Sequence, residues 1–257
     1  MKHVPEALRA FFAAHPKIAL AFSGGCDSAY LLYAAIACGA DVRAYYVCSQ
    51  FQPAFELEDA QRLAGELGAE MRVFDLDVLA DETVRKNPAN RCYFCKQRIF
   101  SAILEAARED GYNCIIDGTN ASDDSFDRPG MRALEEMQVL SPLRLCGIAK
   151  ADVRRLSREA GLFTWNKPAY ACLATRIPAG REIKAQALQK IERGEAALAR
   201  LGVSDFRLRM AGNAARLEIT EEQLPLLLER RQAILAALEA DFGEITLNLR
   251  TRKGMEL

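Results

Sequence analysis

The sequence predicts an α/β protein with a doubly wound parallel sheet, followed by a small C-terminal α+β domain. Three observations predict this class. Apolar runs of strand length alternate with helical patterns up to residue 160, a glycine-rich turn joins the first run to a helix, and the order of elements then changes. A chain of 257 residues can bury the core of one large domain plus an appendage. We therefore expect two domains, over residues 1–165 and 166–257.

In the first domain, the predicted strands are apolar runs separated by amphipathic segments. They lie at Ile18–Phe22, Val42–Cys48, Met71–Leu76, Cys114–Asp117 and Gln138–Leu143. Helical patterns near 27–38, 56–68, 96–110 and 150–160 connect them, an order typical of successive βαβ units with helices on both faces of the sheet. The polar stretch 81–91, which contains Pro88, predicts a long functional loop.

The second domain has a different order of elements. Residues 165–180, which include Pro168 and Pro178, indicate the boundary. A helix over 186–201, strands over 205–211 and 214–220, a helix over 222–240 and a strand over 244–250 are expected to follow. The turn at Gly212–Asn213 predicts antiparallel pairing of the two adjacent strands. The Leu- and Ala-rich helix over 222–240 is a candidate subunit interface for a homo-oligomer, and the alternative is that it packs on its own domain.

Charge and apolar content exclude several classes of protein. A net charge of −1 gives no general attraction to a polyanion, which argues against a nucleic-acid partner. No stretch approaches the roughly 20 apolar residues of a membrane span, and no secretion signal is visible, so we expect a cytoplasmic protein with no membrane partner. Its eight cysteines are then expected to be reduced and to serve metal binding or sulfur chemistry.

The turn after the first strand is the strongest motif for ligand binding. It reads Ser23-Gly24-Gly25-Cys26-Asp27-Ser28. Two glycines let the backbone approach a ligand, and the free N–H groups at the start of the helix form a site for a phosphate. Asp27 would repel that phosphate directly, so it either caps the helix or acts through Mg²⁺. No Lys follows the last Gly as in the Walker pattern, which disfavours γ-phosphoryl transfer, and a plain capped strand-to-helix turn is the alternative.

This hexapeptide resembles the SGGxDS signature of PP-loop ATP pyrophosphatases. The resemblance implies an adenine nucleotide alpha hydrolase-like fold that binds ATP at the carboxyl edge of the sheet and attaches AMP to a substrate oxygen. The segment Asp117–Asn120, which includes Gly118, follows the fourth strand, where such a sheet places ligand-binding residues. Ser141–Leu143 and Lys150–Arg154 resemble the PL…K-DVR segment of these domains, and a loop with a capped surface helix is the alternative.

Cys92-Tyr93-Phe94-Cys95 is the second motif, expected immediately before a helix. Half a zinc site, a redox pair, two cluster ligands or two unrelated thiols all fit it. A third ligand has to be another cysteine, because the chain has only two histidines. Five of the others are either expected in the core or have no informative neighbours: Cys26, Cys38, Cys48, Cys114 and Cys146. Cys172, expected to be exposed near Arg176, is the predicted third partner, and three thiolates suit a [4Fe–4S] cluster with one open iron better than structural zinc.

Several segments together resemble the LarE family of PP-loop sulfur transferases, which build a nickel-pincer cofactor. They are Trp165-Asn166-Lys167 with Cys172, Arg176 and Pro178, and Asp127-Arg128-Pro129-Gly130. The resemblance implies that ATP adenylates a carboxylate of pyridinium-3,5-biscarboxylic acid mononucleotide, which then becomes a thiocarboxylate. In one branch a single cysteine, matched by Cys172, gives up its own sulfur and becomes dehydroalanine. The Cys92–Cys95 pair resembles the other branch, in which a three-cysteine cluster carries an extra sulfide supplied by a sulfide donor.

The same resemblance implies roles for residues of the second domain. Glu195, Arg207 and Glu218 match positions of the family's transferase domain, so Cys172, Glu195 and Arg207 are the implied catalytic residues. Arg176, Arg207 and Arg209 are candidates for gripping phosphate and carboxylate, because a guanidinium matches both in a bidentate way. The alternative for Arg207 and Arg209 is a solvated strand face.

Three other functions stay open. A tRNA thiolase shares the loop and often three cysteines, but it predicts a basic face and an RNA-binding addition, and neither is visible in the sequence. An ammonia-using amidating ligase would leave the cysteine pair unused. A nucleotide-binding sensor would need neither Cys172 nor the arginines near it.

Overall fold

The computed structural model describes residues 3–123 and 129–252, and they divide into two units. The first unit comprises Met1–Val84 and Asn90–Lys167. The second unit comprises Pro168–Leu257 and the short segment Arg85–Ala89. No pattern in the sequence points to Arg85–Ala89 as part of the second unit. Its backbone is held there by hydrogen bonds from Gly180 N to Asn87 O (2.7 Å) and from Ile183 N to Arg85 O (2.8 Å).

The first unit contains a parallel sheet in the order β3-β2-β1-β4. Its strands are β1 (Lys17–Ala21), β2 (Asp41–Cys48), β3 (Glu70–Asp75) and β4 (Ile115–Ile116). Its helices are α1 (Glu6–Ala14), α2 (Cys26–Ala37), α3 (Ala54–Leu67), η1 (Val78–Ala80), α5 (Arg91–Glu109), α6 (Pro129–Glu136), α7 (Pro142–Leu145), α8 (Lys150–Glu159) and η2 (Phe163–Asn166). The parallel, helix-flanked sheet confirms the predicted fold class.

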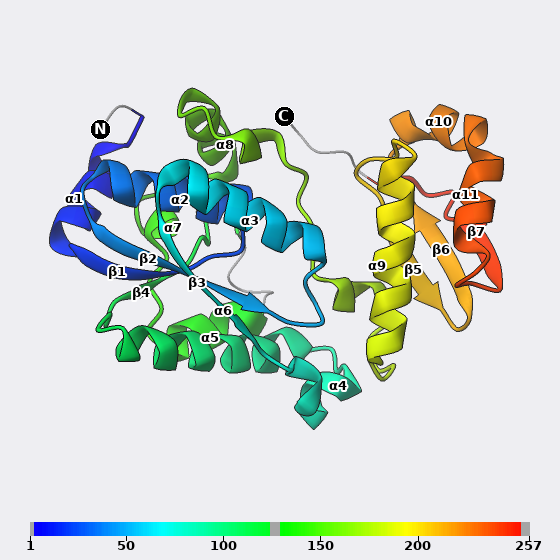
Figure 1. Ribbon diagram of the computed structural model, residues 1–257, viewed down its shortest axis with the longest axis horizontal. Helices are drawn as coiled ribbons and strands as arrows, with labels where there is room; N and C mark the ends of the chain where they lie inside the picture. The colour runs from blue at the N-terminus through cyan, green and yellow to red at the C-terminus, as the bar shows by residue number, and fades with distance from the viewer. Residues whose placement is uncertain (1–2, 124–128, 253–257) are drawn as a thin grey trace. The chain divides into compact units, whose positions relative to one another are not determined.

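Both faces of this sheet are buried because alternate strand residues point to opposite sides. Ile18 and Leu20 of β1 pack with α1, α2, α3 and α8 in one core cluster. Ala19 of β1 and Tyr45 and Val47 of β2 pack with α5 and α6 in another. Figure 1 shows α2 and α3 on one side of the sheet and α5 and α6 on the other. The carboxyl end of β1 therefore leads into a loop that is fixed by helices on both faces.

The prediction of a fifth strand at Gln138–Leu143 is wrong. The segment is reduced to one bridge between Ile116 and Leu140, with Leu140 N donating to Ile115 O at 3.0 Å. Pro142 then begins α7, because proline has no N–H for a strand ladder and fits the first turn of a helix. The predicted loop 81–91 is also partly helical, since α4 covers Glu82–Lys86.

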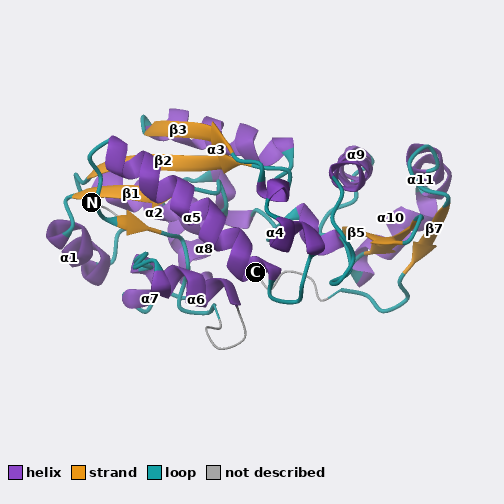
Figure 2. Ribbon diagram, turned by 90° about the horizontal axis from the view of Figure 1, so that it is seen from below, coloured by secondary structure: helices purple, strands orange, loops and turns teal. Residues whose placement is uncertain are grey.

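The second unit contains a mixed sheet in the order β5-β6-β7. Its strands are β5 (Arg207–Ala211), β6 (Ala214–Glu218) and β7 (Glu244–Leu247), and its helices are η3 (Leu173–Arg176), α9 (Ala185–Arg200), η4 (Glu221–Gln223), α10 (Leu224–Glu229) and α11 (Arg231–Leu238). β5 and β6 are antiparallel, as predicted, and β6 and β7 are parallel. Figure 2 shows α9 and α11 on one side of this sheet. Leu208 and Leu217 pack against them in the core of the unit.

The helix predicted over 222–240 is broken into η4, α10 and α11. Ile234 and Leu238 of α11 are buried in the core, whereas η4 and α10 bury no residue. Arg230 is both the C-cap of α10 and the N-cap of α11. None of the helices within residues 3–123 and 129–252 has both the length and the apolar character needed to cross a membrane.

Candidate active site

The glycine-rich loop joins β1 to α2 at the carboxyl edge of the first unit's sheet. Gly24 has φ +69°, and a Cβ there would lie 3.0 Å from Ala60 Cβ and 3.1 Å from Glu56 O. Only glycine fits this conformation and this close approach to α3. Gly25 is the N-cap residue and provides no side-chain cap. The first-turn N–H groups of α2 therefore point to a position that an anion can occupy.

Two serines set the shape of the loop. Ser23 Oγ and Ser28 Oγ lie 3.1 Å apart, and Ser28 Oγ also donates to Gly25 O at 3.2 Å. Ser23 N donates to Ser28 Oγ at 3.3 Å. Because these bonds hold the two ends of the loop together, its backbone amides are preorganised before any ligand binds.

The segment after β4 lies directly against this loop. A Cβ on Gly118 would be 2.9 Å from Ser28 N and 3.2 Å from Ser28 Cα, so this position also requires glycine. Next to it, Asp117 accepts from Ser141 Oγ at 2.6 Å and from Thr119 Oγ1 at 2.5 Å. The buried Asp117 thus ties the segment after β4 to the residue that precedes α7.

Asp27 is where these segments meet. Lys150 Nζ, at the start of α8, donates to Asp27 Oδ2 at 2.5 Å, and Asn120 Nδ2 donates to Asp27 Oδ1 at 3.3 Å. The glycine-rich loop, the segment after β4 and the Lys150 segment were singled out separately in the sequence, and here they converge. The carboxylate beside the anion position is neutralised by Lys150, and both side chains stay partly accessible to a ligand.

The eight cysteines are buried to different degrees. Burial raises the pKa of the Cys26, Cys38, Cys48, Cys114 and Cys146 thiols, which makes them poor thiolates. Cys92 is exposed, and Cys95 and Cys172 are half-buried. These are the three that the sequence selected as cluster ligands.

The helix α5 begins at Arg91, five residues before the predicted start at 96, so Cys92 and Cys95 lie within it rather than before it. Their spacing of three residues puts both thiols on one face of the helix. Cys172 precedes η3, where its carbonyl accepts from Thr175 N at 2.9 Å. Cys92 and Cys95 belong to the first unit and Cys172 to the second. Over the described ranges, no three His, Cys, Asp or Glu side chains are grouped to hold a metal ion.

In the second unit, Arg176 and Glu195 form a buried ion pair. Arg176 Nε donates to Glu195 Oε1 at 2.7 Å, and Arg176 Nη2 donates to Glu195 Oε2 at 3.2 Å. Tyr170 also donates to Glu195, and so does Leu208 N, at 2.9 Å. Arg176 Nη1 holds Ala171 O at 3.1 Å. The pair therefore links α9 and β5 to the backbone on both sides of Cys172.

Arg207 is buried, so it does not belong to a solvated strand face. Its guanidinium donates to the carbonyl oxygens of Phe206 (2.7 Å) and Ala169 (2.5 Å), and within the described part of the chain it forms no ion pair with a carboxylate. Burial, together with the nearby charges of Arg176 and Arg252, lowers the pKa of Arg207 to about 10. A buried cation without a carboxylate partner has strong affinity for an anionic ligand.

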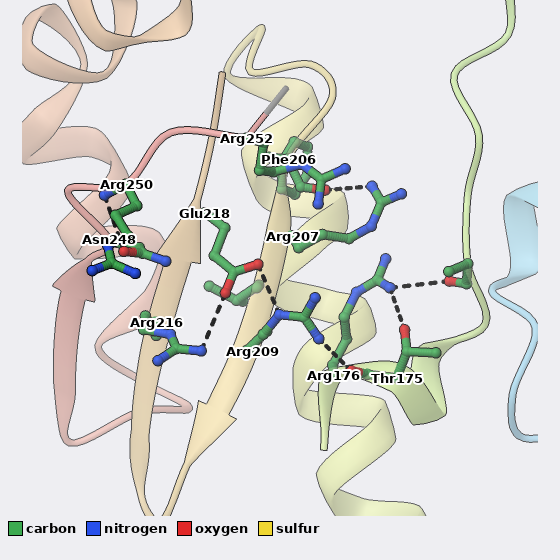
Figure 3. A network of polar contacts seen from close by, with 12 residues as sticks. Thr175, Arg176, Phe206, Arg207, Arg209, Arg216, Glu218, Asn248, Arg250 and Arg252 are labelled. Atoms are coloured by element: carbon green, nitrogen blue, oxygen red, sulfur yellow. Dashed lines mark hydrogen bonds and ion pairs between the residues drawn. The ribbon is translucent and has the colours of Figure 1, made fainter. Parts of the chain in front are cut away.

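Arg209, Arg216 and Glu218 lie on the sheet face opposite the apolar core (Figure 3). Glu218 Oε2 accepts from Arg209 Nε at 2.7 Å, and Glu218 Oε1 accepts from Arg216 Nη2 at 3.2 Å. Arg209 Nη1 also donates to Thr175 O at 2.6 Å. Burial acts to raise the pKa of Glu218, but the hydrogen bond from Arg209 and the charges of the neighbouring arginines outweigh it and lower that pKa.

A pocket of about 370 Å³ opens over this face. Its lining combines three arginines, one carboxylate and several apolar side chains: Thr175, Arg176, Pro178, Arg209, Met210, Ala211, Arg216 and Glu218. Arg176, Arg209 and Glu218 were predicted from the sequence, whereas Arg216 and Met210 were not. The alternation Arg216–Leu217–Glu218 on a predicted strand was the available signal for Arg216. In the Asp127–Gly130 motif, Asp127 and Arg128 lie outside the described residues.

Comparison with known proteins gives the family. Residues 13–199 match the family model described as thiamine biosynthesis protein (ThiI). The chain is 31% identical over 236 residues to the pyridinium-3,5-bisthiocarboxylic acid mononucleotide synthase of Lactiplantibacillus plantarum, covering 91% of this chain and 86% of the relative. The chain belongs to the ThiI family and is a LarE-type sulfur transferase.

Two other relatives are similar over part or most of the chain. An uncharacterized protein of Synechocystis sp. is 38% identical over 85% of this chain and 82% of its own length. A tRNA-specific 2-thiouridylase of Clostridium botulinum is 29% identical, and the match covers 58% of this chain and 52% of that protein. The LarE-type chain is therefore an enzyme of sulfur transfer with a PP-loop, and its family implies the use of ATP.

Proposed function

We propose that this enzyme uses ATP to adenylate a carboxylate of pyridinium-3,5-biscarboxylic acid mononucleotide and converts that carboxylate to a thiocarboxylate. The arginine-lined pocket of the second unit carries the proposal, because guanidinium groups bind phosphate and carboxylate and this substrate bears both. The likeness to the bisthiocarboxylic acid mononucleotide synthase covers nearly the whole chain and supports the same substrate class.

The first unit would activate the substrate. The amides of the Ser23–Ser28 loop and the start of α2 would hold ATP phosphates, and Gly118 would allow the backbone to stay close. Asp27 is a partly exposed carboxylate beside this proposed phosphate site, and it fits as a protein ligand for Mg²⁺. Lys150 would balance the negative charge of the phosphates. A carboxylate oxygen of the substrate attacks the α-phosphorus, pyrophosphate leaves, and an acyl-adenylate is formed. A sulfur nucleophile then displaces AMP from the acyl carbon.

A [4Fe–4S] cluster would take its three protein ligands from Cys92, Cys95 and Cys172. Cys92 is exposed, Cys95 lies three residues further along the same helix, and Cys172 is half-buried. When bound, such a cluster would supply a sulfide that a donor can renew. The alternative is that Cys172 gives up its own sulfur and ends as dehydroalanine. In both cases Arg176 positions Cys172 by holding Ala171 O, and Arg207 and Arg209 bind the anionic substrate.

The experiment that tests this proposal measures iron and acid-labile sulfide per chain in anoxically purified protein. Wild type is compared with Cys172→Ser and with Cys146→Ser, a control at a thiol whose pKa burial raises. About four irons in wild type and in Cys146→Ser, with loss in Cys172→Ser, are expected for a three-cysteine cluster. Absence of iron after reconstitution, with loss of the Cys172 sulfur after one turnover by intact mass, would support the sacrificial route instead.

Thiolation of tRNA is the second candidate, favoured by the likeness to tRNA-specific 2-thiouridylases over 58% of this chain. Formation of AMP separates the two functions. We expect ATP to yield AMP and pyrophosphate with the pyridinium mononucleotide and not with unmodified tRNA. AMP formation with tRNA alone would replace the proposed substrate.

A further inference from the structure

The pocket of the second unit carries charges of alternating sign. Arg209 and Arg216 stand directly opposite each other in the register of β5 and β6. Like charges at opposed positions are destabilising. Glu218, two residues beyond Arg216 on the same strand face, lies between the two guanidiniums and bonds to both. Arg176 adds no net charge to the pocket because Glu195 neutralises it. The pocket thus presents a positive, a negative and again a positive group.

This pattern is complementary to a ligand in which a cation lies between two anions. A pyridinium carboxylate mononucleotide is such a ligand, since its ring nitrogen is positively charged, its ring carries a carboxylate and its ribose carries a phosphate. Two arginines alone would bind the anionic groups but would repel the ring. Pro178 and Ala211, which also line the pocket, offer apolar contact area for a flat ring.

Resting on the proposed function, we propose that Glu218 recognises the positive charge of the pyridinium ring and that Arg209 and Arg216 bind the anionic groups on either side of it. Glu218 is therefore a specificity-determining residue that selects cationic pyridinium rings over uncharged rings of the same shape. Arg216 is a substrate-binding residue in the same site. In the ligand-free protein, Glu218 keeps the opposed arginines together and so keeps the site formed.

A matched pair of ligands isolates the ring charge. Nicotinic acid mononucleotide has a pyridinium ring, one carboxylate and one phosphate, and its 1,4-dihydro form keeps both anionic groups but has an uncharged ring. Calorimetry or fluorescence titration gives the dissociation constant of each ligand for wild type, Glu218→Gln and the control Glu221→Gln. Glu221 is an exposed carboxylate on η4 outside the pocket. The ratio of the two constants within one variant does not depend on the fraction of protein that is folded.

We expect wild type and Glu221→Gln to bind the oxidised ligand about fivefold more tightly than the reduced one, equivalent to about 1 kcal/mol for one charge pair near the surface. Glu218→Gln should bring this ratio to about one. An unchanged ratio in Glu218→Gln, or no preference in wild type, overturns the inference. AMP formation with pyridinium-3,5-biscarboxylic acid mononucleotide is measured in parallel, so that loss of the charge preference is distinguished from failure of the proposed function itself.

Discussion

Removal of the carboxylate of Glu195 should strongly destabilise the second unit. The Arg176 side chain is completely buried and that of Glu195 is 5% exposed. Glu195→Ala leaves the guanidinium without its carboxylate and takes an acceptor from Leu208 N. A buried charge that loses its partner destabilises by about 3–5 kcal/mol, and 3 kcal/mol corresponds to about a 100-fold change in an equilibrium constant.

Hydrogen exchange followed by mass spectrometry measures this loss of stability in the second unit. We expect amide exchange in β5 and β6, around Leu208 and Leu217, to become about 100-fold faster in Glu195→Ala. Glu192 is a half-buried residue on the same helix, and Glu192→Ala should change these exchange rates by less than about tenfold. The double variant Arg176→Met with Glu195→Leu should recover most of the protection, because it leaves no unpaired charge. Less than a tenfold acceleration in Glu195→Ala would refute the buried-pair reasoning.

Three further changes test other parts of the two sites. Gly118→Ala places a Cβ against Ser28 N, and an overpacked position of this kind costs roughly 1–3 kcal/mol. The affinity for ATP, measured by calorimetry, should therefore fall about tenfold or more. Lys150→Ala removes a charge-assisted contact of about 1.5–3 kcal/mol, and AMP formation at low ATP should fall about 10- to 100-fold. Arg207→Met removes a buried cation, so the free energy of unfolding should be unchanged or should rise by up to about 2 kcal/mol in thermal denaturation. Binding of nicotinic acid mononucleotide should be lost.

Each of these changes has a matched control. Gly65→Ala lies on α3 with nothing within 4 Å of the added Cβ, and it should leave ATP affinity unchanged. Lys17→Ala, at the amino end of β1, should leave AMP formation unchanged. Arg200→Met, at the exposed end of α9, should leave ligand binding unchanged. Equal effects of a test variant and its control would argue against the assigned role.

The sequence predicted the fold class and the glycine-rich loop because both depend on local pattern. Alternating apolar runs and helices define a parallel sheet, and Gly24 and Gly25 define a tight turn wherever they occur. Proline and packing together decided the helix that was predicted wrongly. Residues 222–240 contain many good helix formers, but Pro225 stands in the first turn of α10 and a second break follows at Arg230. Ile234 and Leu238 of α11 are buried in the core, whereas Leu224, Leu226 and Leu227 are only partly buried against it.

The site was predictable to different degrees in the two units. Motif spacing identified the loop and Lys150, but the Lys150–Asp27 contact joins residues 123 positions apart and could only be seen in the fold. In the second unit, a strand with alternating arginines fits a solvated surface as well as a ligand site. The burial of Arg207 and the register that sets Arg209 opposite Arg216 distinguish the two, and both are properties of the packed sheet.

The charged face of the second unit is poorly explained by stability alone. Its sheet is held by the apolar face against α9 and α11, which needs no arginine. The opposite face instead contains a buried guanidinium without a carboxylate, which lowers the stability of the ligand-free protein, and two opposed arginines that share the single carboxylate of Glu218. An anionic ligand would supply the negative charge that both arrangements lack. Strain of this kind is expected where binding, rather than folding, determines the residue, and it supports the proposal that the second unit binds the substrate.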